Sequence, residues 1–207
     1  MTALRVRAPA KVNWTLEVLG RRPDGYHEVR TALQTIALSD WVTLTPADGL
    51  SLALSGEAGP LASEPLEANL AYRAAERLRG ELGGHARGVR IAIEKHVPVA
   101  AGLGGGSSDA AAVLRGLRRL WQLDIPDDEL ATLAAELGAD VPFFLRGGAA
   151  LASGRGEVLE TLPDAPLRWV FIMFPLHTPA PDKTARMYAA LRPEHYTDGS
   201  RTEGLAA

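Results

Sequence analysis

Apolar side chains recur at every second position, or in short uninterrupted runs, over much of this chain, and both patterns predict β-strands. In residues 12–19, for example, Val12, Trp14, Leu16 and Val18 alternate with polar residues. By these criteria we expect strands at residues 4–7, 12–19, 28–38, 41–45, 50–54, 89–93, 141–145, 149–153, 158–162 and 169–174.

Apolar positions spaced by three and four residues predict helices between these strands. The expected helices cover residues 69–82, 107–121, 126–137 and 181–191, whereas residues 55–68 are rich in turn-forming types and the chain after 192 has no core pattern. Asn69 and the sequence Ser107-Ser108-Asp109 are residue types that favour helix starts. The alternation of elements predicts a mixed sheet with helices packed on it.

Composition narrows the class of protein. The 207 residues are 46% hydrophobic and 23% charged, enough to build one domain or slightly more. A net charge of −3 gives no support to nucleic-acid binding, and the absence of cysteine excludes disulfides and thiolate chemistry. We see no signal peptide and no run approaching the ~18 apolar residues of a membrane span. A cytoplasmic protein without a membrane partner is expected, and its oligomeric state is left open.

The most distinctive stretch is Pro98-Val-Ala-Ala-Gly-Leu-Gly-Gly-Gly-Ser-Ser-Asp109. Glycines running into a helix start expose backbone N–H groups at the positive end of the helix dipole, where anions bind. A P-loop would need lysine after the glycines, and a dinucleotide fingerprint starting at Gly102 would need glycine where Ser107 stands. We expect this stretch to bind phosphate. The alternative is a glycine linker between a strand and a helix, with no ligand.

Four segments in order carry a resemblance to a known family. They are Ala8-Pro-Ala-Lys-Val-Asn13, Arg22-Pro-Asp-Gly-Tyr-His27, the glycine stretch and Gly138-Ala-Asp-Val-Pro-Phe-Phe144. Together they resemble the 4-diphosphocytidyl-2-C-methylerythritol kinases of the GHMP kinase superfamily. The resemblance implies a two-domain α+β fold: an N-terminal ATP-binding and catalytic domain at residues 1–155, then the incomplete start of a ferredoxin-like C-terminal domain at 156–207.

The same resemblance implies a role for each matched residue. Lys11 and Asp140 would be catalytic. The residues implied to bind ATP are Asn69, Lys95, Pro98, Gly102, Leu103, Gly104, Gly105, Gly106, Ser107 and Ser108. Those implied to bind the substrate are Asn13, Tyr26, His27, Thr184 and Tyr188. Mg²⁺ would accompany ATP, with Ser108 as a candidate ligand.

Simpler explanations exist for several of these residues. On pattern alone, Lys11 is typical of a solvated strand-edge residue, and Asp140 of a turn-former or helix cap. Capping is a sufficient role for Asn69, and Tyr26 and His27 fit a hairpin with an aromatic flank as well as a base-binding platform. Lys183 stands where the family has serine, which puts the local contacts of Thr184 in doubt.

The implied activity is ATP-dependent phosphorylation of the 2-hydroxyl of 4-diphosphocytidyl-2-C-methylerythritol, in isoprenoid precursor synthesis by the non-mevalonate pathway. The partner is then a small molecule with a cytidine diphosphate group. There are two alternatives: another small-alcohol kinase of the superfamily, and a non-catalytic nucleotide-binding remnant. The remnant is suggested because the family's third motif, Gly-Ser-Gly-Pro, does not occur here. For the same reason we expect slow turnover and exposed apolar surface near residues 169–174.

Overall fold

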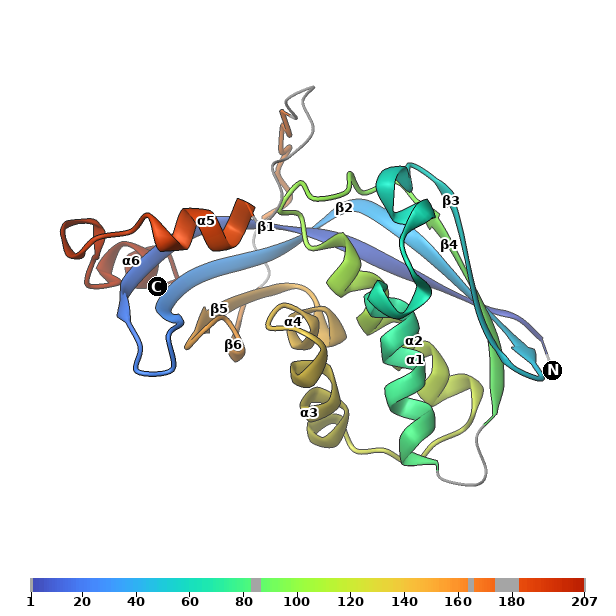
Figure 1. Ribbon diagram of the computed structural model, residues 1–207. Helices are drawn as coiled ribbons and strands as arrows, with labels where there is room; N and C mark the ends of the chain where they lie inside the picture. The colour runs from blue at the N-terminus through green and yellow to red at the C-terminus, as the bar shows by residue number, and fades with distance from the viewer. Residues whose placement is uncertain (1, 83–86, 164–165, 174–182, 207) are drawn as a thin grey trace. The chain divides into compact units, whose positions relative to one another are not determined.

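The computed structural model describes residues 2–82, 87–163, 166–173 and 183–206. The chain forms two compact units. The first contains Met1–Lys11 and Thr35–Gly147, and the second contains Val12–Gln34 and Gly148–Ala207. Two long strands, β1 (Leu4–Arg21) and β2 (His27–Ala47), contribute residues to both units (Figure 1). The expected division into a domain at residues 1–155 and the start of a second at 156–207 stays a prediction.

In the first unit, β2 pairs antiparallel with β4 (Gly88–Lys95), from Trp41 opposite Glu94 to Ala47 opposite Gly88. Strand β4 also pairs in parallel with β3 (Leu50–Gly56). Every second residue in the paired parts of β2 and β4 enters the core, because side chains of a strand alternate between its faces. The buried set is Val42, Leu44, Val89, Ile91 and Ile93.

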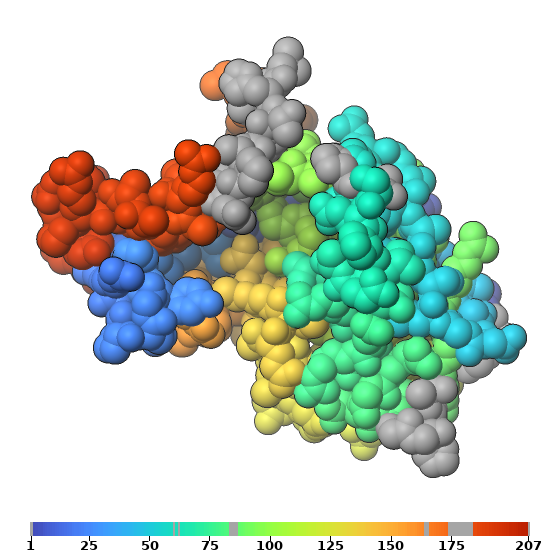
Figure 2. Space-filling view, viewed as in Figure 1, coloured from blue at the N-terminus to red at the C-terminus, as the bar shows by residue number. Residues whose placement is uncertain are grey.

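Four helices complete the first unit: α1 (Leu70–Glu81), α2 (Gly105–Leu120), α3 (Asp127–Leu137) and α4 (Val141–Arg146). Two short 3₁₀ helices, Gly59–Ser63 and Leu66–Ala68, lie in the segment expected to be a loop. Helix α2 packs closely on the strands, since a Cβ at Gly116 would lie 2.4 Å from a methyl group of Leu44. Helices α1 and α3 lie side by side at the surface (Figure 2).

The second unit is built on the first half of β2. Residues Thr31–Gln34 pair antiparallel with β5 (Ala149–Ser153), which pairs with β6 (Val158–Leu162). Further along are α5 (Lys183–Ala189), a 3₁₀ helix at Pro193–His195 and α6 (Ser200–Ala206). The mixed sheet with packed helices confirms the expected fold class.

The C-terminal segment of the second unit is more ordered than its sequence pattern indicates. The Thr197 N–H donates to the Val18 carbonyl at 2.9 Å, and the Thr202 N–H donates to the buried Glu17 carboxylate at 2.7 Å. Polar contacts such as these, rather than a buried apolar face, fix the segment in position. Pattern analysis, which reads apolar spacing, therefore missed it.

Three strand expectations are wrong. Residues 4–7 and 12–19 belong to one continuous strand, and residues 28–38 and 41–45 belong to another. Residues 141–145 form helix α4 rather than a strand. Such a short apolar run does not distinguish a buried strand from a buried helix.

A fourth strand expectation, residues 169–174, is also wrong where the structure describes it: residues 169–173 form no regular element, and Phe174 lies outside the described residues. The side chains of Leu167, Trp169, Phe171 and Met173 are more than nine-tenths exposed, which confirms the expected apolar surface there. No helix in the described ranges is both long and apolar enough to cross a bilayer.

Candidate active site

The glycine stretch ends in the first turn of α2. Helix α2 begins at Gly105, and its N-cap residue, Gly104, has φ of +73°. The Ser108 N–H donates to the Gly104 carbonyl at 2.9 Å, so the N–H groups of residues 105–107 precede the intrahelical ladder. The helix thus starts two residues before the expected Ser-Ser-Asp cap, and no side chain caps it. Backbone N–H groups, rather than capping side chains, face outward where a phosphate would approach.

Glycine is required at position 104 by two observations. Its φ is one that L-residues rarely adopt, and a Cβ there would lie 2.7 Å from the Phe144 ring and 3.1 Å from Cγ of Lys11. The backbone joins the same elements, because the Lys11 N–H donates to the Leu103 carbonyl at 2.9 Å. The glycine loop, β1 and α4 therefore meet at one place.

Lys11 and Asp140 lie at this meeting point. The Lys11 ammonium is 3.7 Å from a carboxylate oxygen of Asp140. Lys11 is only 7% exposed, whereas the Asp140 side chain is 40% exposed and open to a ligand. Asp140 directly precedes α4, whose Phe143 and Phe144 are buried and fix the position of the loop. A buried cation beside an open carboxylate is suited to taking a proton from an acceptor near a phosphate.

Lys95, which the resemblance implies to bind ATP, has its side chain in a buried cluster of ionisable groups. Its ammonium donates to Asp40 and, at 2.7 Å, to Asp109, and all three residues are at most 4% exposed. Burial alone would lower the pKa of Lys95, but Asp109 and Asp40 outweigh it and raise that pKa. Burial raises the pKa of Asp109 to about 7, against the opposing effect of the Lys95 charge. An adenine base near Lys95 would contact the backbone of that residue, because the Lys95 side chain is bound to the two carboxylates.

The raised pKa of Asp109 predicts a dependence of stability on pH. Asp109 ionises near 3.8 in an unfolded chain and near 7 in the folded protein, so the folded state binds this proton more tightly between those values. That contribution to stability is lost as pH rises through about 7. Asp109→Asn cannot titrate, so its Tm relative to wild type should increase by several degrees from pH 5 to pH 8. Thermal unfolding across this range checks it, and a constant difference in Tm would contradict it.

Asn69 caps α1 as expected. Its side-chain oxygen accepts from the N–H groups of Ala71 and Tyr72 at 2.9 and 3.4 Å. Asn69 also lines a hollow of about 110 Å³, together with Leu52, Leu54, Leu61, Glu64, Pro65 and Leu66. The cap uses the side-chain oxygen, so a base entering this apolar hollow would meet the amide NH₂ of Asn69.

The two serines of the glycine stretch differ in burial. Ser107 is partly exposed, but Ser108 is fully buried and its hydroxyl has no hydrogen-bond partner among the described residues. Ser107 is therefore the more accessible of the two hydroxyls to a bound phosphate. The described residues also contain no group of three or more His, Cys, Asp or Glu side chains arranged for a metal ion. Ser108 thus does not fit direct metal contact in this conformation.

The residues expected at the substrate lie in the second unit, and three rings gather there. The His27 ring centroid is 5.2 Å from that of Tyr188 and 6.1 Å from that of Tyr196. Tyr26 is 57% exposed, and the guanidinium of Arg155 lies 4.9 Å from its ring centroid. The structure therefore brings His27 together with Tyr188, and adds Tyr196, which sequence reasoning missed.

Asn13 and Thr184, also expected at the substrate, do not take part in these ring contacts. The amide of Asn13 donates to the Thr31 hydroxyl at 2.8 Å, between two neighbouring strands. Thr184 is exposed on α5. The predicted role of Thr184 thus gains no support from this geometry.

Comparisons with known proteins identify the family. The model for the GHMP kinases N terminal domain matches residues 69–148. The 4-diphosphocytidyl-2-C-methyl-D-erythritol kinase of Heliobacterium modesticaldum is 50% identical over 189 residues, covering 91% of this chain and 58% of that protein. The same kinase of Dehalococcoides mccartyi is 41% identical over 202 residues, covering 98% of this chain and 69% of that protein. The chain belongs to the 4-diphosphocytidyl-2-C-methyl-D-erythritol kinase family.

A solved family structure agrees with this assignment. A crystal structure of 4-(cytidine 5'-diphospho)-2C-methyl-D-erythritol kinase matches with a TM-score of 0.72 at 41% identity, covering 94% of this chain and 66% of that chain. The chain spans 58% to 64% of the length of the first two curated family members that it matches.

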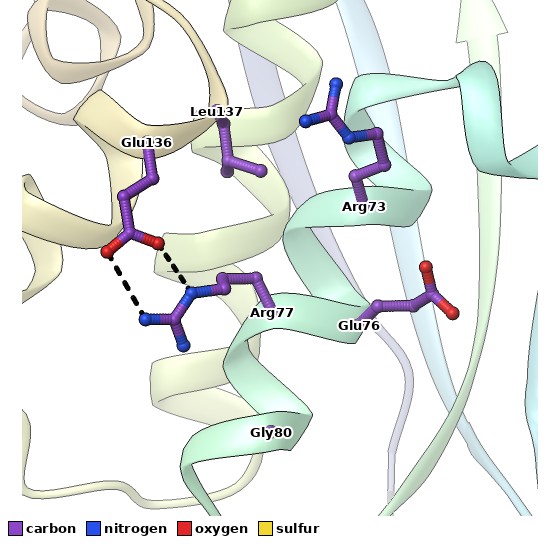
Figure 3. Close-up of a pocket in the computed structure, with 6 residues that line it drawn as sticks. All are labelled: Arg73, Glu76, Arg77, Gly80, Glu136 and Leu137. Atoms are coloured by element: carbon purple, nitrogen blue, oxygen red, sulfur yellow. Dashed lines mark hydrogen bonds and ion pairs between the residues drawn. The ribbon is translucent and has the colours of Figure 1, made fainter.

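A second hollow in the described part of the chain lies away from the residues that the family motifs mark. It measures about 400 Å³ and lies between α1 and α3, lined by Arg73, Glu76, Arg77, Gly80, Glu136 and Leu137. Figure 3 shows Arg77 reaching Glu136 through two hydrogen bonds, of 2.6 and 3.3 Å, while Arg73 points away. None of these residues belongs to a family motif, and the paired charges tie two helices together.

Proposed function

We propose that this chain is an ATP-dependent kinase that phosphorylates the 2-hydroxyl of 4-diphosphocytidyl-2-C-methylerythritol, a step of isoprenoid precursor synthesis. The observation that carries the proposal is the meeting of Lys11, Asp140 and the glycine loop. The Lys11–Asp140 pair at 3.7 Å lies beside Gly104, at the start of a helix whose N-terminus favours phosphate.

Each group has a separate task in this reaction. The N–H groups at the start of α2 bind the ATP phosphates, and Asp140 accepts the proton of the acceptor hydroxyl. Lys11 neutralises charge that develops on the transferring phosphoryl group. Such transfers depend mainly on positioning and electrostatic stabilisation, since their transition state is loose.

Mg²⁺ enters the proposal only as the ion that accompanies ATP. It neutralises phosphate charge and is usually held by phosphate oxygens with few protein ligands. The buried position of Ser108 gives no support to a direct contact. A cytoplasmic location stays a prediction.

The aromatic residues of the second unit support a substrate with a cytosine base. Arg155 covers one face of Tyr26, and the high exposure of Tyr26 leaves the other face for stacking. His27 can hydrogen-bond to the edge of a base. These features favour a cytidine-bearing substrate over homoserine or mevalonate, which have no base to stack.

Replacing Tyr26 with alanine tests this assignment. Loss of one base–aromatic stack costs about 1–3 kcal/mol, so affinity for cytidine diphosphate should fall about tenfold or more. Affinity for ATP should be unchanged, because ATP is assigned to the glycine loop. Isothermal titration with each nucleotide provides the measurement.

Trp169→Ala is the matched control, because Trp169 is an aromatic that is 96% exposed and belongs to no family motif. It should leave both affinities unchanged. Equal weakening by the two variants, or none by Tyr26→Ala, would show that Tyr26 is not the cytosine platform.

A further inference from the structure

Asp40 forms an unusual set of contacts at the point where β4 ends. One oxygen of its carboxylate accepts from the N–H groups of His96 and Val97, at 2.6 and 2.8 Å. The other oxygen accepts from the ammonium of Lys95. Asp40 is 0% exposed, so all three contacts are made without solvent.

These contacts replace strand pairing where it stops. The ladder between β2 and β4 ends with Trp41 opposite Glu94, and that between β3 and β4 ends with Gly56 opposite Lys95. The next two N–H groups, of His96 and Val97, have no strand partner and would be costly to bury unpaired. Asp40 satisfies both and so fixes the backbone as it enters the glycine loop.

The far end of the glycine loop is tied to the same carboxylate through Lys95. The Lys95 ammonium also donates to Asp109 of α2, at 2.7 Å. A Cβ at Gly105, the first residue of α2, would lie 3.1 Å from the Val97 side chain and 3.4 Å from the Lys95 ammonium. The residues before the loop thus pack directly against the residues after it.

Stability alone does not explain three buried charges at this place. Apolar residues of similar volume often stabilise a protein as much as a buried ion pair does, because burial of charge is costly. What a carboxylate adds is geometry, since its oxygens accept from fixed directions.

We infer that Asp40 is a positioning residue, which holds the glycine loop in the shape that binds the phosphates of ATP. This inference rests on the proposed function for the identity of the ligand. The anchoring of the loop itself rests only on the contacts of Asp40, so the two can fail separately.

Two asparagine variants separate this role from a simple loss of charge. In Asp40→Asn the amide NH₂ must face either the Lys95 ammonium or the N–H groups of His96 and Val97, so donor meets donor in both orientations. In Asp109→Asn the amide oxygen still accepts from Lys95, and the NH₂ replaces an oxygen that has no partner among the described residues. Both variants replace a carboxyl group that accepts from the same lysine with an amide that cannot ionise.

We expect Asp40→Asn to weaken ATP binding about tenfold or more, and Asp109→Asn to weaken it less than about threefold. Binding of cytidine diphosphate, measured on the same samples, should be unchanged in both. A purely structural role would lower the affinity for both nucleotides together with Tm. Unchanged ATP affinity in Asp40→Asn, or parallel loss of both affinities, would overturn the inference.

Hydrogen exchange of the wild-type chain gives an independent test that needs no folded variant. The amides of His96 and Val97 should exchange as slowly as those of β4, although they lie outside the strand ladder. Fast exchange of these amides would overturn the anchoring by Asp40. A wild-type chain that protects them but binds no ATP would contradict the proposed function and leave the anchoring in place.

Discussion

Replacing Asp140 with asparagine is expected to lower kcat by about 10²- to 10⁴-fold, the range of general-base contributions. The amide keeps the size of the side chain beside Lys11 but cannot accept the proton of the acceptor hydroxyl. ATP affinity should stay within about threefold of wild type, because the glycine loop is untouched. Steady-state kinetics and ATP titration on the same preparation measure the two quantities.

Asp48→Asn is the matched control for this variant. Asp48 is an exposed carboxylate in the turn between β2 and β3, with no family motif nearby. The control should retain wild-type kcat. If Asp140→Asn also retained it, the proton would have another acceptor and the assignment of Asp140 would be wrong.

Gly106→Val is expected to weaken ATP binding about tenfold or more, since a branched side chain would stand where the first turn of α2 admits the phosphates. The fold should tolerate it. Among the described residues, a Cβ at Gly106 would have one neighbour within 4 Å, a Leu70 methyl group at 3.9 Å, and the φ of Gly106 is not in the left-handed region. Gly104 is unsuitable for this test, because a Cβ there would collide with Phe144.

Gly80→Val provides the control, because Gly80 is also an exposed helical glycine with open space around its Cβ. Both variants carry the same cost of a β-branched residue in a helix. Only Gly106→Val should change ATP affinity in titration. Similar affinities for the two variants would contradict phosphate binding at the start of α2.

The parts of the fold that the sequence predicted are those with a strong local pattern. The apolar faces of α1, α2 and α3, the cap at Asn69 and the strands β3 to β6 follow from periodicity and residue type. The glycine loop before α2 was also predicted, because few residue types other than glycine permit its backbone.

The parts that sequence reasoning missed depend on tertiary contacts. Helix α4 was predicted as a strand because six residues are too few to show a period, and the packing of Phe143 and Phe144 decides its conformation. Asp40 belongs to no motif, and an aspartate at the end of a predicted strand usually indicates a turn. Its role appears only when β4 and α2 are brought beside it.

Formation of ADP by this chain, with ATP and 4-diphosphocytidyl-2-C-methylerythritol together, tests the central claim most directly. The account predicts that ADP appears in step with a product that carries a new phosphate on the 2-hydroxyl, located by phosphorus NMR. It also predicts no ADP above background with homoserine or mevalonate, and ADP formation at least about a hundredfold slower with the Asp140→Asn variant. Binding of ATP without any phosphorylated product would contradict the account and favour a non-catalytic nucleotide-binding protein.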